Sequence, residues 1–339
     1  MPDRCQHVRR SDFDANLIPS DAAPGWLRAL HDTTSDAPRP LEGRYAGNGV
    51  VALTQPNRFA APAGVLKRAA STKRKSNLLH EARVLALLAH TGSPAQALAP
   101  RLLGLWRLSS PDTLYMLTST LSGIPLADLP GIPNLRSQIS RLIDTLHAVQ
   151  RPAGLTNEGV EVESWQQHAS AELTRYARLL DDHRHAAAAA VLRRLRDVPI
   201  DQSSGHCLVH RDLSPTNLIV QPGHDDVAVR ACDFASSFFG PRLWELAGAE
   251  LFLFPARPEL RAALRSHFEH VAGDSCAEQT LCLTVWQLGR LYAAAHRRGD
   301  AAATRRIARA LNSADPGPLR DSGDCYRHAA MLGDHLRSR

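Results

Sequence analysis

A stretch just after residue 206 holds acidic and amide side chains at spacings that suit the transfer of a phosphoryl group. Asp212 is followed closely by Asn217, and Asp233 comes after an apolar segment. Phosphoryl transfer needs a carboxylate beside the attacking hydroxyl and oxygen ligands for the Mg²⁺ that bridges the phosphates. Asp212 can supply the first, and Asn217 and Asp233 can supply the second. Taken one at a time, these residues could be two turn formers and a strand-end cap, but that interpretation does not explain their joint order.

Two apolar runs must bring these side chains together. Residues 218–220 and 227–232 are short, apolar and bounded by polar residues, so they predict a pair of strands. Acidic and amide groups at the ends of paired strands can converge on one point. The sequence therefore predicts a single site built from residues that lie up to 21 positions apart.

The chain before residue 120 predicts a small sheet with one helix. Leucine and alanine at helical spacing place the helix within residues 75–92, where Gly92 ends it. Strands are predicted on both sides of a glycine-rich turn within residues 41–55, and at residues 63–69, 102–106 and 114–117.

The remainder predicts mainly helix. Residues 1–40 are polar and rich in proline, with one short helix predicted at residues 24–33. The longer helical stretches are residues 135–150, 164–196, 258–273, 278–298 and 301–313.

Composition limits the class of protein. A chain of 339 residues with 44% hydrophobic and 22% charged residues suits one large or two medium globular domains. Aromatic content of 5% argues against a stacking platform for nucleic acid, and a net charge of +6 permits an anionic ligand without implying nucleic acid. No apolar run reaches the roughly 20 residues of a membrane helix. Six cysteines without a CxxC spacing predict reduced thiols in a cytoplasmic protein.

The motifs resemble those of a known family. VHRDLSPTNLIV, residues 209–220, looks like the HxDxxxxN loop of the aminoglycoside phosphotransferase and choline kinase-like group of small-molecule kinases, within the protein-kinase-like superfamily. CDFASSFFGPRLWELA, residues 232–247, is similar to that group's metal-binding Asp, short loop and helix. TLSGIPLADL, residues 120–129, resembles its hinge. The resemblance covers about residues 41–310.

The resemblance implies an α+β, bilobal protein-kinase-like fold, with a small N-lobe of sheet plus one helix and a mainly helical C-lobe. Residues 1–40 would be an N-terminal extension and residues 41–120 the nucleotide-binding N-lobe. Residues 121–339 would form the C-lobe, with the catalytic loop and the metal and substrate sites. No nucleic acid or membrane partner is implied.

The resemblance also implies roles for individual residues. Asp212 would orient, and could deprotonate, a substrate hydroxyl, while Asn217 and Asp233 would hold Mg²⁺. Lys67, on a strand, would pair with Glu81 on the following helix and so meet the α- and β-phosphates of ATP, with GTP as the alternative nucleotide.

Further nucleotide contacts are implied at two backbone segments. A turn at Gly47 and Gly49 would let the backbone approach the phosphates, although it could also be a plain hairpin turn. The hinge around Ser119 and Leu121 would meet the adenine.

The lysines are concentrated near this predicted site. Only three of the 40 basic residues are lysines, and they are Lys67, Lys73 and Lys75. Lysine is a compact point charge, whereas arginine is a wide planar fork, so Lys67 is predicted to have a role that arginine cannot take. Lys73 and Lys75 are predicted to lie in a solvated turn.

Two details favour a small-molecule kinase over a protein kinase. Ser214 stands where protein Ser/Thr kinases usually carry lysine, and the segment between Asp233 and Glu245 has no room for a long activation loop. Arg211 instead favours a protein kinase, because many small-molecule kinases have glycine at this position. A protein Ser/Thr kinase and a non-catalytic nucleotide-binding regulatory module remain the alternatives.

The acceptor is predicted only as a hydroxyl compound, such as an antibiotic, a sugar, a nucleoside-like metabolite or an amino alcohol. Aminoglycosides are polycations, which require an acidic pocket. Residues 246–339 contain ten acidic residues against thirteen arginines, and this balance favours a neutral or anionic acceptor.

Overall fold

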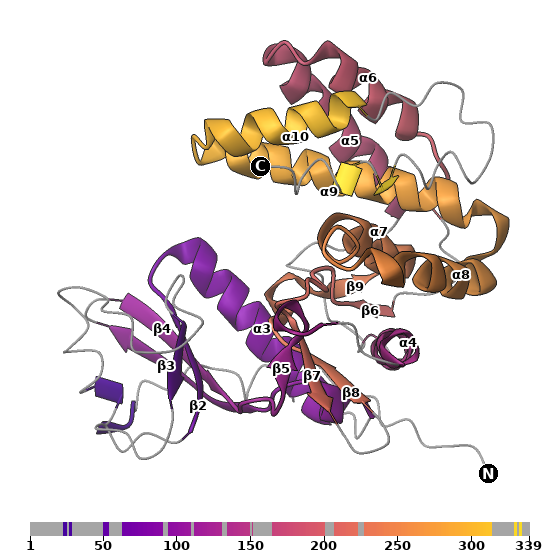
Figure 1. Cartoon of the computed structure of the whole chain (residues 1–339). Coiled ribbons are helices and arrows are strands. Elements are labelled where there is room, and N and C mark those ends of the chain that lie inside the picture. The colour runs from indigo at the N-terminus through magenta and orange to yellow at the C-terminus, as the bar shows by residue number, and fades with distance from the viewer. Residues whose placement is uncertain are drawn as a thin grey trace.

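The computed structural model consists of two lobes (Figure 1). It describes residues 23–25, 27–28, 50–53, 63–90, 94–109, 112–130, 134–149, 151, 165–200, 207–222, 227–313, 329–330 and 332–333. The predicted glycine-rich turn lies outside these residues, as does most of the predicted helix at 24–33.

The small lobe is a four-stranded antiparallel sheet with a helix beside it. The strands are β1 (Val50–Leu53), β2 (Gly64–Ala69), β3 (Leu102–Ser109) and β4 (Asp112–Thr118), in the order β1-β2-β4-β3. Lys67 lies opposite Val50 on one side and Met116 on the other, so a central strand carries it. Position within a paired strand restricts the backbone at Lys67.

Helix α3 (Thr72–His90) connects this sheet to the rest of the molecule. Its buried residues Leu78, Ala82 and Leu85 recur at helical spacing and form one apolar face. In Figure 1 the helix runs from the sheet towards β7 (Leu218–Pro222) in the large lobe. Side chains on its inner face can therefore contact both lobes.

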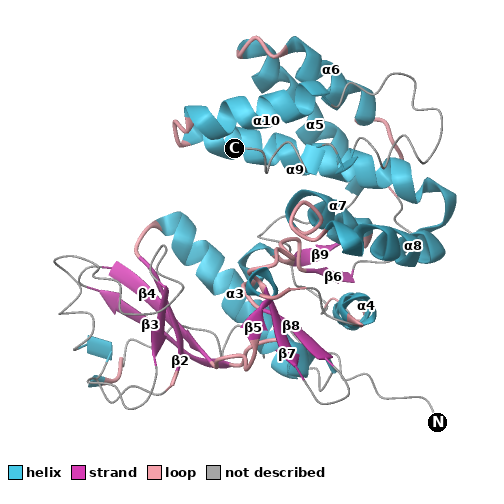
Figure 2. Ribbon diagram, viewed as in Figure 1, coloured by secondary structure: helices cyan, strands magenta, loops and turns pink. Residues whose placement is uncertain are grey.

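The large lobe is mainly helical, as Figure 2 shows. Helices α7 (Leu243–Phe252) and α9 (Cys276–Arg297) are largely buried in it, and the ring centroids of Trp286 on α9 and Trp244 on α7 lie 4.4 Å apart in an edge-to-face arrangement. The helices are α4 (Leu135–His147), α5 (Trp165–Asp182), α6 (Ala186–Leu195), α7 (Leu243–Phe252), α8 (Arg261–Ala272), α9 (Cys276–Arg297) and α10 (Ala301–Ser313).

Short strands and turns complete the fold. One sheet has the order β5-β7-β8, and β6 pairs with β9 in a second. Their bounds are β5 (Ile124–Pro125), β6 (Cys207–Val209), β8 (Val227–Ala231) and β9 (Phe238–Gly240). Five 3₁₀ turns are described: η1 (Pro94–Leu98), η2 (Leu126–Asp128), η3 (Phe234–Ser236), η4 (Pro258–Leu260) and η5 (Gly273–Ser275).

The segment that connects the lobes, residues 119–129, is held by hydrogen bonds to the large lobe. The buried guanidinium of Arg257 donates to the carbonyl oxygens of Leu126 (3.2 Å) and Leu129 (3.3 Å). The N–H of Ala127 donates to the carbonyl of Pro215, which lies between Asp212 and Asn217. The connector is thereby fixed to the loop that carries the predicted catalytic residues.

Cys207, Cys232, Cys276 and Cys282 are free thiols, which agrees with the prediction of reduced cysteines for the part of the chain described. Among the described helices, none has both the length and the apolar character needed to cross a membrane.

A buried histidine in the large lobe leads to a stability prediction. His147 is 7% exposed, and its Nε2 has no hydrogen-bond partner among the described residues. Burial, with smaller contributions from the charges of Arg242 and His267, lowers its pKa to about 3. The unfolded chain, where the histidine pKa is about 6.5, therefore binds more protons than the folded chain between these values, and stability is lost as pH falls below about 6.5.

We expect His147→Leu to relieve this loss. The change that the substitution makes in the free energy of unfolding should be about 2 kcal/mol more favourable at pH 5 than at pH 8. The reason is that pH 5 lies about 1.5 units below the histidine pKa of the unfolded chain. Urea titrations at the two pH values measure the difference, with His270→Leu on the exposed side of α8 as control. An equal effect of His147→Leu at both pH values would contradict the argument.

Candidate active site

The loop after β6 is built around a fully buried histidine. The Nδ1 of His210 accepts a hydrogen bond from the N–H of Asp212 (3.3 Å), so its Nε2 carries the proton and donates to the carbonyl of Cys232 (3.0 Å). Burial lowers the pKa of His210 to about 4, which keeps the ring neutral in this arrangement. The ring also meets Phe234 edge-on at 4.6 Å. His210 therefore ties the loop carrying Asp212 to the strand end that carries Asp233.

Glu245 on α7 holds the same loop from the other side. Its carboxylate is buried and accepts the N–H groups of His210 (2.7 Å) and Arg211 (3.1 Å). Burial raises the pKa of Glu245 to about 7, and the two N–H donors oppose the rise. Arg211 has a φ of 67°, in the left-handed region, which glycine adopts more readily than other residues. A Cβ on Gly248 would lie 2.9 Å from the Arg211 carbonyl oxygen, so glycine lets α7 approach the loop closely.

Asp212 and Asn217 lie at the two ends of a closed turn. The Nδ2 of Asn217 donates to the Asp212 carbonyl (2.9 Å), and its N–H donates to Ser214 (2.9 Å). Burial and the nearby charge of Asp233 raise the pKa of the Asp212 carboxyl, while Arg211 and Asn217 oppose the rise. Asp212 is therefore a stronger base than an exposed aspartate.

Lys67 joins the two lobes at this site. Its Nζ lies 2.8 Å from both carboxylate oxygens of Glu81 and 3.0 Å from Oδ1 of Asp233. Burial lowers the pKa of Lys67, but the charges of Glu81 and Asp233 and their hydrogen bonds outweigh it and raise the pKa to about 12. The structure thus brings together Lys67, Glu81, Asp233, Asp212 and Asn217.

The oxygen groups suit Mg²⁺ in the presence of phosphates. Because the Asn217 amide donates through Nδ2, its Oδ1 is left without a hydrogen-bond partner among the described residues and can act as a ligand. The Asp233 side chain is 46% exposed, so its carboxylate is open to solvent as well as to Lys67. In the described part of the chain, no three His, Cys, Asp or Glu side chains are grouped to hold a metal. Mg²⁺ binds readily to one or two protein oxygens when phosphates and water complete its shell.

Comparison with known proteins identifies the family. The model of the phosphotransferase enzyme family, APH, matches residues 39–279, which is most of the chain. The chain belongs to this family. It is therefore a kinase-type phosphotransferase. No curated protein matches the chain by sequence.

Solved structures of the family share the fold of this phosphotransferase. The GDP complex of wild-type aminoglycoside 2'-phosphotransferase-IIIa has 12% sequence identity and a TM-score of 0.57, over 86% of this chain and 98% of that one. A thermostable mutant of aminoglycoside phosphotransferase APH(4)-Ia, in ternary complex with AMP-PNP and hygromycin B, has 17% identity and a TM-score of 0.55, over 79% and 86%. These likenesses confirm the α+β bilobal kinase-like fold.

The predicted hinge follows β4. The N–H of Ser119 donates to the Arg101 carbonyl (2.8 Å), and its Oγ accepts the Arg101 N–H (2.9 Å). The N–H of Ser119 is therefore committed to the sheet. The N–H of Leu121 donates to no described residue, so Leu121 offers the free donor of the predicted pair. Gly47 and Gly49 lie outside the described residues.

The other two lysines differ from each other. Lys73 is exposed, as predicted, but Nζ of Lys75 lies 2.5 Å from Oδ2 of Asp112. Nε of Arg107 lies 2.9 Å from Oδ1 of the same carboxylate. Hydrogen bonds from Arg107 and Lys75 lower the pKa of Asp112 to about 2. Lys75 therefore links the start of α3 to the β3–β4 hairpin, and the prediction that this residue lies in a solvated turn was wrong.

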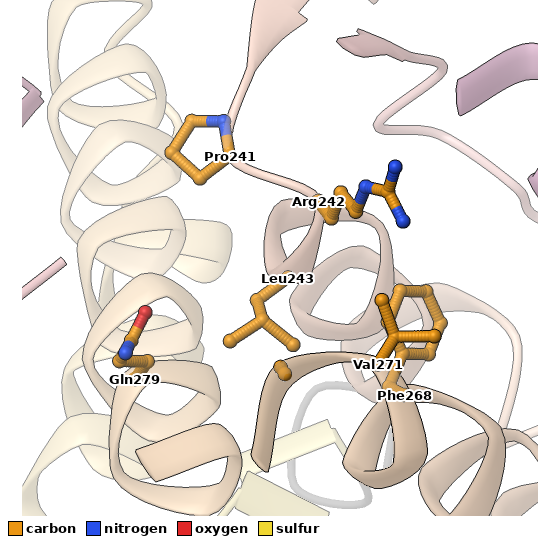
Figure 3. Close-up of a pocket in the computed structure, with 7 residues that line it drawn as sticks. Pro241, Arg242, Leu243, Phe268, Val271 and Gln279 are labelled. Atoms are coloured by element: carbon orange, nitrogen blue, oxygen red, sulfur yellow. The ribbon is translucent and has the colours of Figure 1, made fainter. Parts of the chain in front are cut away.

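A separate hollow of about 300 Å³ lies on the large lobe (Figure 3). It is lined by the start of α7, the end of α8 and Gln279 of α9, and its lining is mostly apolar. None of the predicted catalytic, metal or nucleotide residues lines it. The hollow is therefore not part of the candidate active site.

Two residues of the site region were not assigned roles from the sequence. His210 was part of the quoted motif, and its place beside Asp212 was the signal that could have identified it as the loop's anchor. His80 also contacts the Asp233 segment, and nothing in its spacing distinguishes it from an ordinary helix histidine.

Proposed function

We propose that this phosphotransferase transfers the γ-phosphoryl group of ATP to a hydroxyl of a small molecule. The observation that carries the proposal is the joint placement of Asp212, Asp233 and Lys67. The pKa of the Asp212 carboxyl is raised, in part by the charge of Asp233, and the partly exposed Asp233 carboxylate accepts a hydrogen bond from Lys67. That combination provides a base, a metal ligand and a phosphate-binding cation in one place.

In the proposed reaction Asp212 orients the acceptor hydroxyl and takes its proton as the oxygen attacks the γ-phosphorus. A raised pKa favours this, because a base is most effective when its pKa approaches the working pH. Lys67, held by Glu81, meets phosphate oxygens. Asn217 and Asp233 would hold Mg²⁺, which neutralises charge on the phosphates when bound.

ATP is the proposed donor and GTP the alternative. Structures of relatives contain AMP-PNP in one case and GDP in another, so the fold accommodates both purines. The free N–H of Leu121 supports a purine-binding hinge. We further propose residues 41–120 as the nucleotide-binding lobe, residues 121–339 as the catalytic and acceptor-binding lobe, and a cytoplasmic location.

A neutral or anionic acceptor is favoured over an aminoglycoside. Although relatives were solved with hygromycin B or kanamycin, several carboxylates of the described large lobe are already engaged. Glu245 holds backbone N–H groups, Glu250 is buried between Arg261 and Arg265, and Glu172 binds Arg175. Engaged carboxylates are poor partners for the ammonium groups of a polycation.

An ATP-consumption screen tests the function. Sugars, nucleoside-like compounds, amino alcohols, hydroxylated acids, aminoglycosides and generic protein substrates would be offered with MgATP or MgGTP. We expect consumption with a neutral or anionic hydroxyl compound. Phosphorylation of protein substrates alone would support the protein-kinase alternative, and binding of nucleotide without any consumption would support the regulatory module.

Lys67→Arg should impair nucleotide use. The ammonium fits between two carboxylates at 2.8–3.0 Å, and the wider guanidinium cannot occupy the same position without displacing Glu81 or Asp233. We expect MgATP affinity to fall about tenfold or more, which corresponds to the loss of one charge-assisted contact. Calorimetric titration with Mg·AMP-PNP measures it.

The matched control is Lys73→Arg, at an exposed position of helix α3, six residues after Lys67. Lys73→Arg should leave the affinity unchanged. If Lys67→Arg and Lys73→Arg gave the same affinity, the phosphate-binding role of Lys67 would be excluded.

A further inference from the structure

Helix α3 contacts the segment that follows the metal-binding aspartate at a point outside the motif. The Nε2 of His80, the residue before Glu81, lies 2.5 Å from the backbone carbonyl oxygen of Ser237. A carbonyl oxygen only accepts hydrogen bonds, so Nε2 carries a proton and donates it. His80 therefore binds a backbone group four residues after Asp233.

Neighbouring residues of α3 hold the two ends of this short segment, residues 233–237. Glu81 accepts a hydrogen bond from the N–H of Phe234, and His80 donates to the carbonyl of Ser237. The segment is also closed on itself, because the N–H (3.1 Å) and the hydroxyl (2.6 Å) of Ser237 both donate to the Phe234 carbonyl. Helix α3 is thus hydrogen-bonded to both ends of a compact turn whose first residue is Asp233.

Two contacts restrict the helix in a way that one cannot. Consecutive helical residues project about 100° apart around the axis, since the helix has 3.6 residues per turn. Glu81, bonded to Lys67 and Phe234, holds α3 at one point of its circumference, beside its buried apolar face. The bond from His80 to the same turn holds the helix at a second point and so opposes rotation of α3 about its axis. The register between Glu81 and Asp233 matters because Lys67 binds both.

We propose that His80 is a positioning residue for phosphoryl transfer. Its hydrogen bond to Ser237 fixes α3 against residues 233–237, so that Lys67 and the Asp233 carboxylate keep the spacing that a metal-bound nucleotide requires. The inference rests on the proposed function, in which Lys67 meets the phosphates and Asp233 holds Mg²⁺.

The test uses three substitutions in the full-length protein. His80→Gln keeps an N–H donor at about the distance of Nε2. His80→Leu removes the donor but keeps apolar bulk, and His80→Asn has a donor that is one methylene too short to reach the Ser237 carbonyl. Lys73→Ala, at an exposed position on the same helix, is the control and should behave as the unchanged protein.

The readout is the Mg²⁺ concentration that half-saturates AMP-PNP binding, together with the melting temperature. We expect His80→Leu and His80→Asn to raise that concentration about tenfold, as for the loss of one hydrogen bond at the site, and His80→Gln to stay within about threefold. Melting temperatures should be similar for Gln and Asn. A Gln variant as weak as Leu and Asn, or Leu and Asn variants that bind normally, would overturn the proposal.

Asp233→Asn in the same titration separates this inference from the proposed function. In one outcome, AMP-PNP binding by Asp233→Asn no longer depends on Mg²⁺, while His80→Leu and His80→Asn need the same Mg²⁺ concentration as the unchanged protein. In that case only the role of His80 is wrong. If Asp233→Asn also binds Mg·AMP-PNP normally, the assignment of the nucleotide site itself fails.

Discussion

Asp212→Asn should reduce phosphoryl transfer about a thousandfold, within the range expected for loss of a general base, while MgATP affinity stays within about threefold. Asparagine keeps the shape of the side chain but cannot take the proton of the acceptor hydroxyl. The backbone contacts of the loop are retained, because the Nδ2 of Asn217 donates to the Asp212 carbonyl, which the substitution leaves in place. Transfer to the acceptor found by screening, and calorimetric nucleotide binding, measure the two effects.

The pH dependence gives an independent check on Asp212. Its pKa is raised, first by burial and then by the charge of Asp233. A base works only when deprotonated, so the rate should fall as pH falls through this raised pKa, above the ordinary aspartate value of about 3.9.

That acid limb should be absent from the residual activity of Asp212→Asn. Thr216→Ala, on the exposed part of the same loop, should keep the full rate and the acid limb. Full turnover by Asp212→Asn would remove Asp212 from the reaction.

Much of the site was predictable because its residues carry signals in their order along the chain. The Lys67–Glu81 pair, which the resemblance to small-molecule kinases implied, forms in the structure at 2.8 Å. The helices were predicted closely because amphipathic spacing extends over many turns. Residues 301–313, for example, form α10 within the same bounds.

The features that were not predicted from the sequence depend on contacts between distant residues, which leave no local pattern in the chain. Strands β6 and β9 are each three buried residues long, too short to show alternation, and each pairs with a strand about 30 residues away in the sequence. The partner of Lys75 is Asp112, on a distant hairpin. His80 binds a backbone carbonyl, and a backbone acceptor exists at every residue, so no spacing in the sequence identifies it.

Asp233→Asn should abolish the Mg²⁺ dependence of nucleotide binding and lower transfer by about a thousandfold or more, because the site loses its only proposed carboxylate ligand for the metal. Asparagine is the right replacement on structural grounds. Asp233 has a φ of 64°, in the left-handed region, which asparagine tolerates better than other non-glycine residues. Asp233→Ala would remove the same ligand but would also strain the backbone, at roughly 1 kcal/mol.

Comparing the two substitutions separates metal binding from backbone conformation. Both should leave AMP-PNP affinity unresponsive to Mg²⁺, whereas only Asp233→Ala should lose unfolding free energy through strain. Asp233→Asn has a second consequence, because the charge of Asp233 helps to raise the pKa of Asp212. With that charge removed, the pKa of Asp212 falls, and the acid limb of the residual activity moves to lower pH. An unchanged Mg²⁺ response would place the metal on other oxygens, and an unmoved acid limb would mean that Asp212 does not sense Asp233.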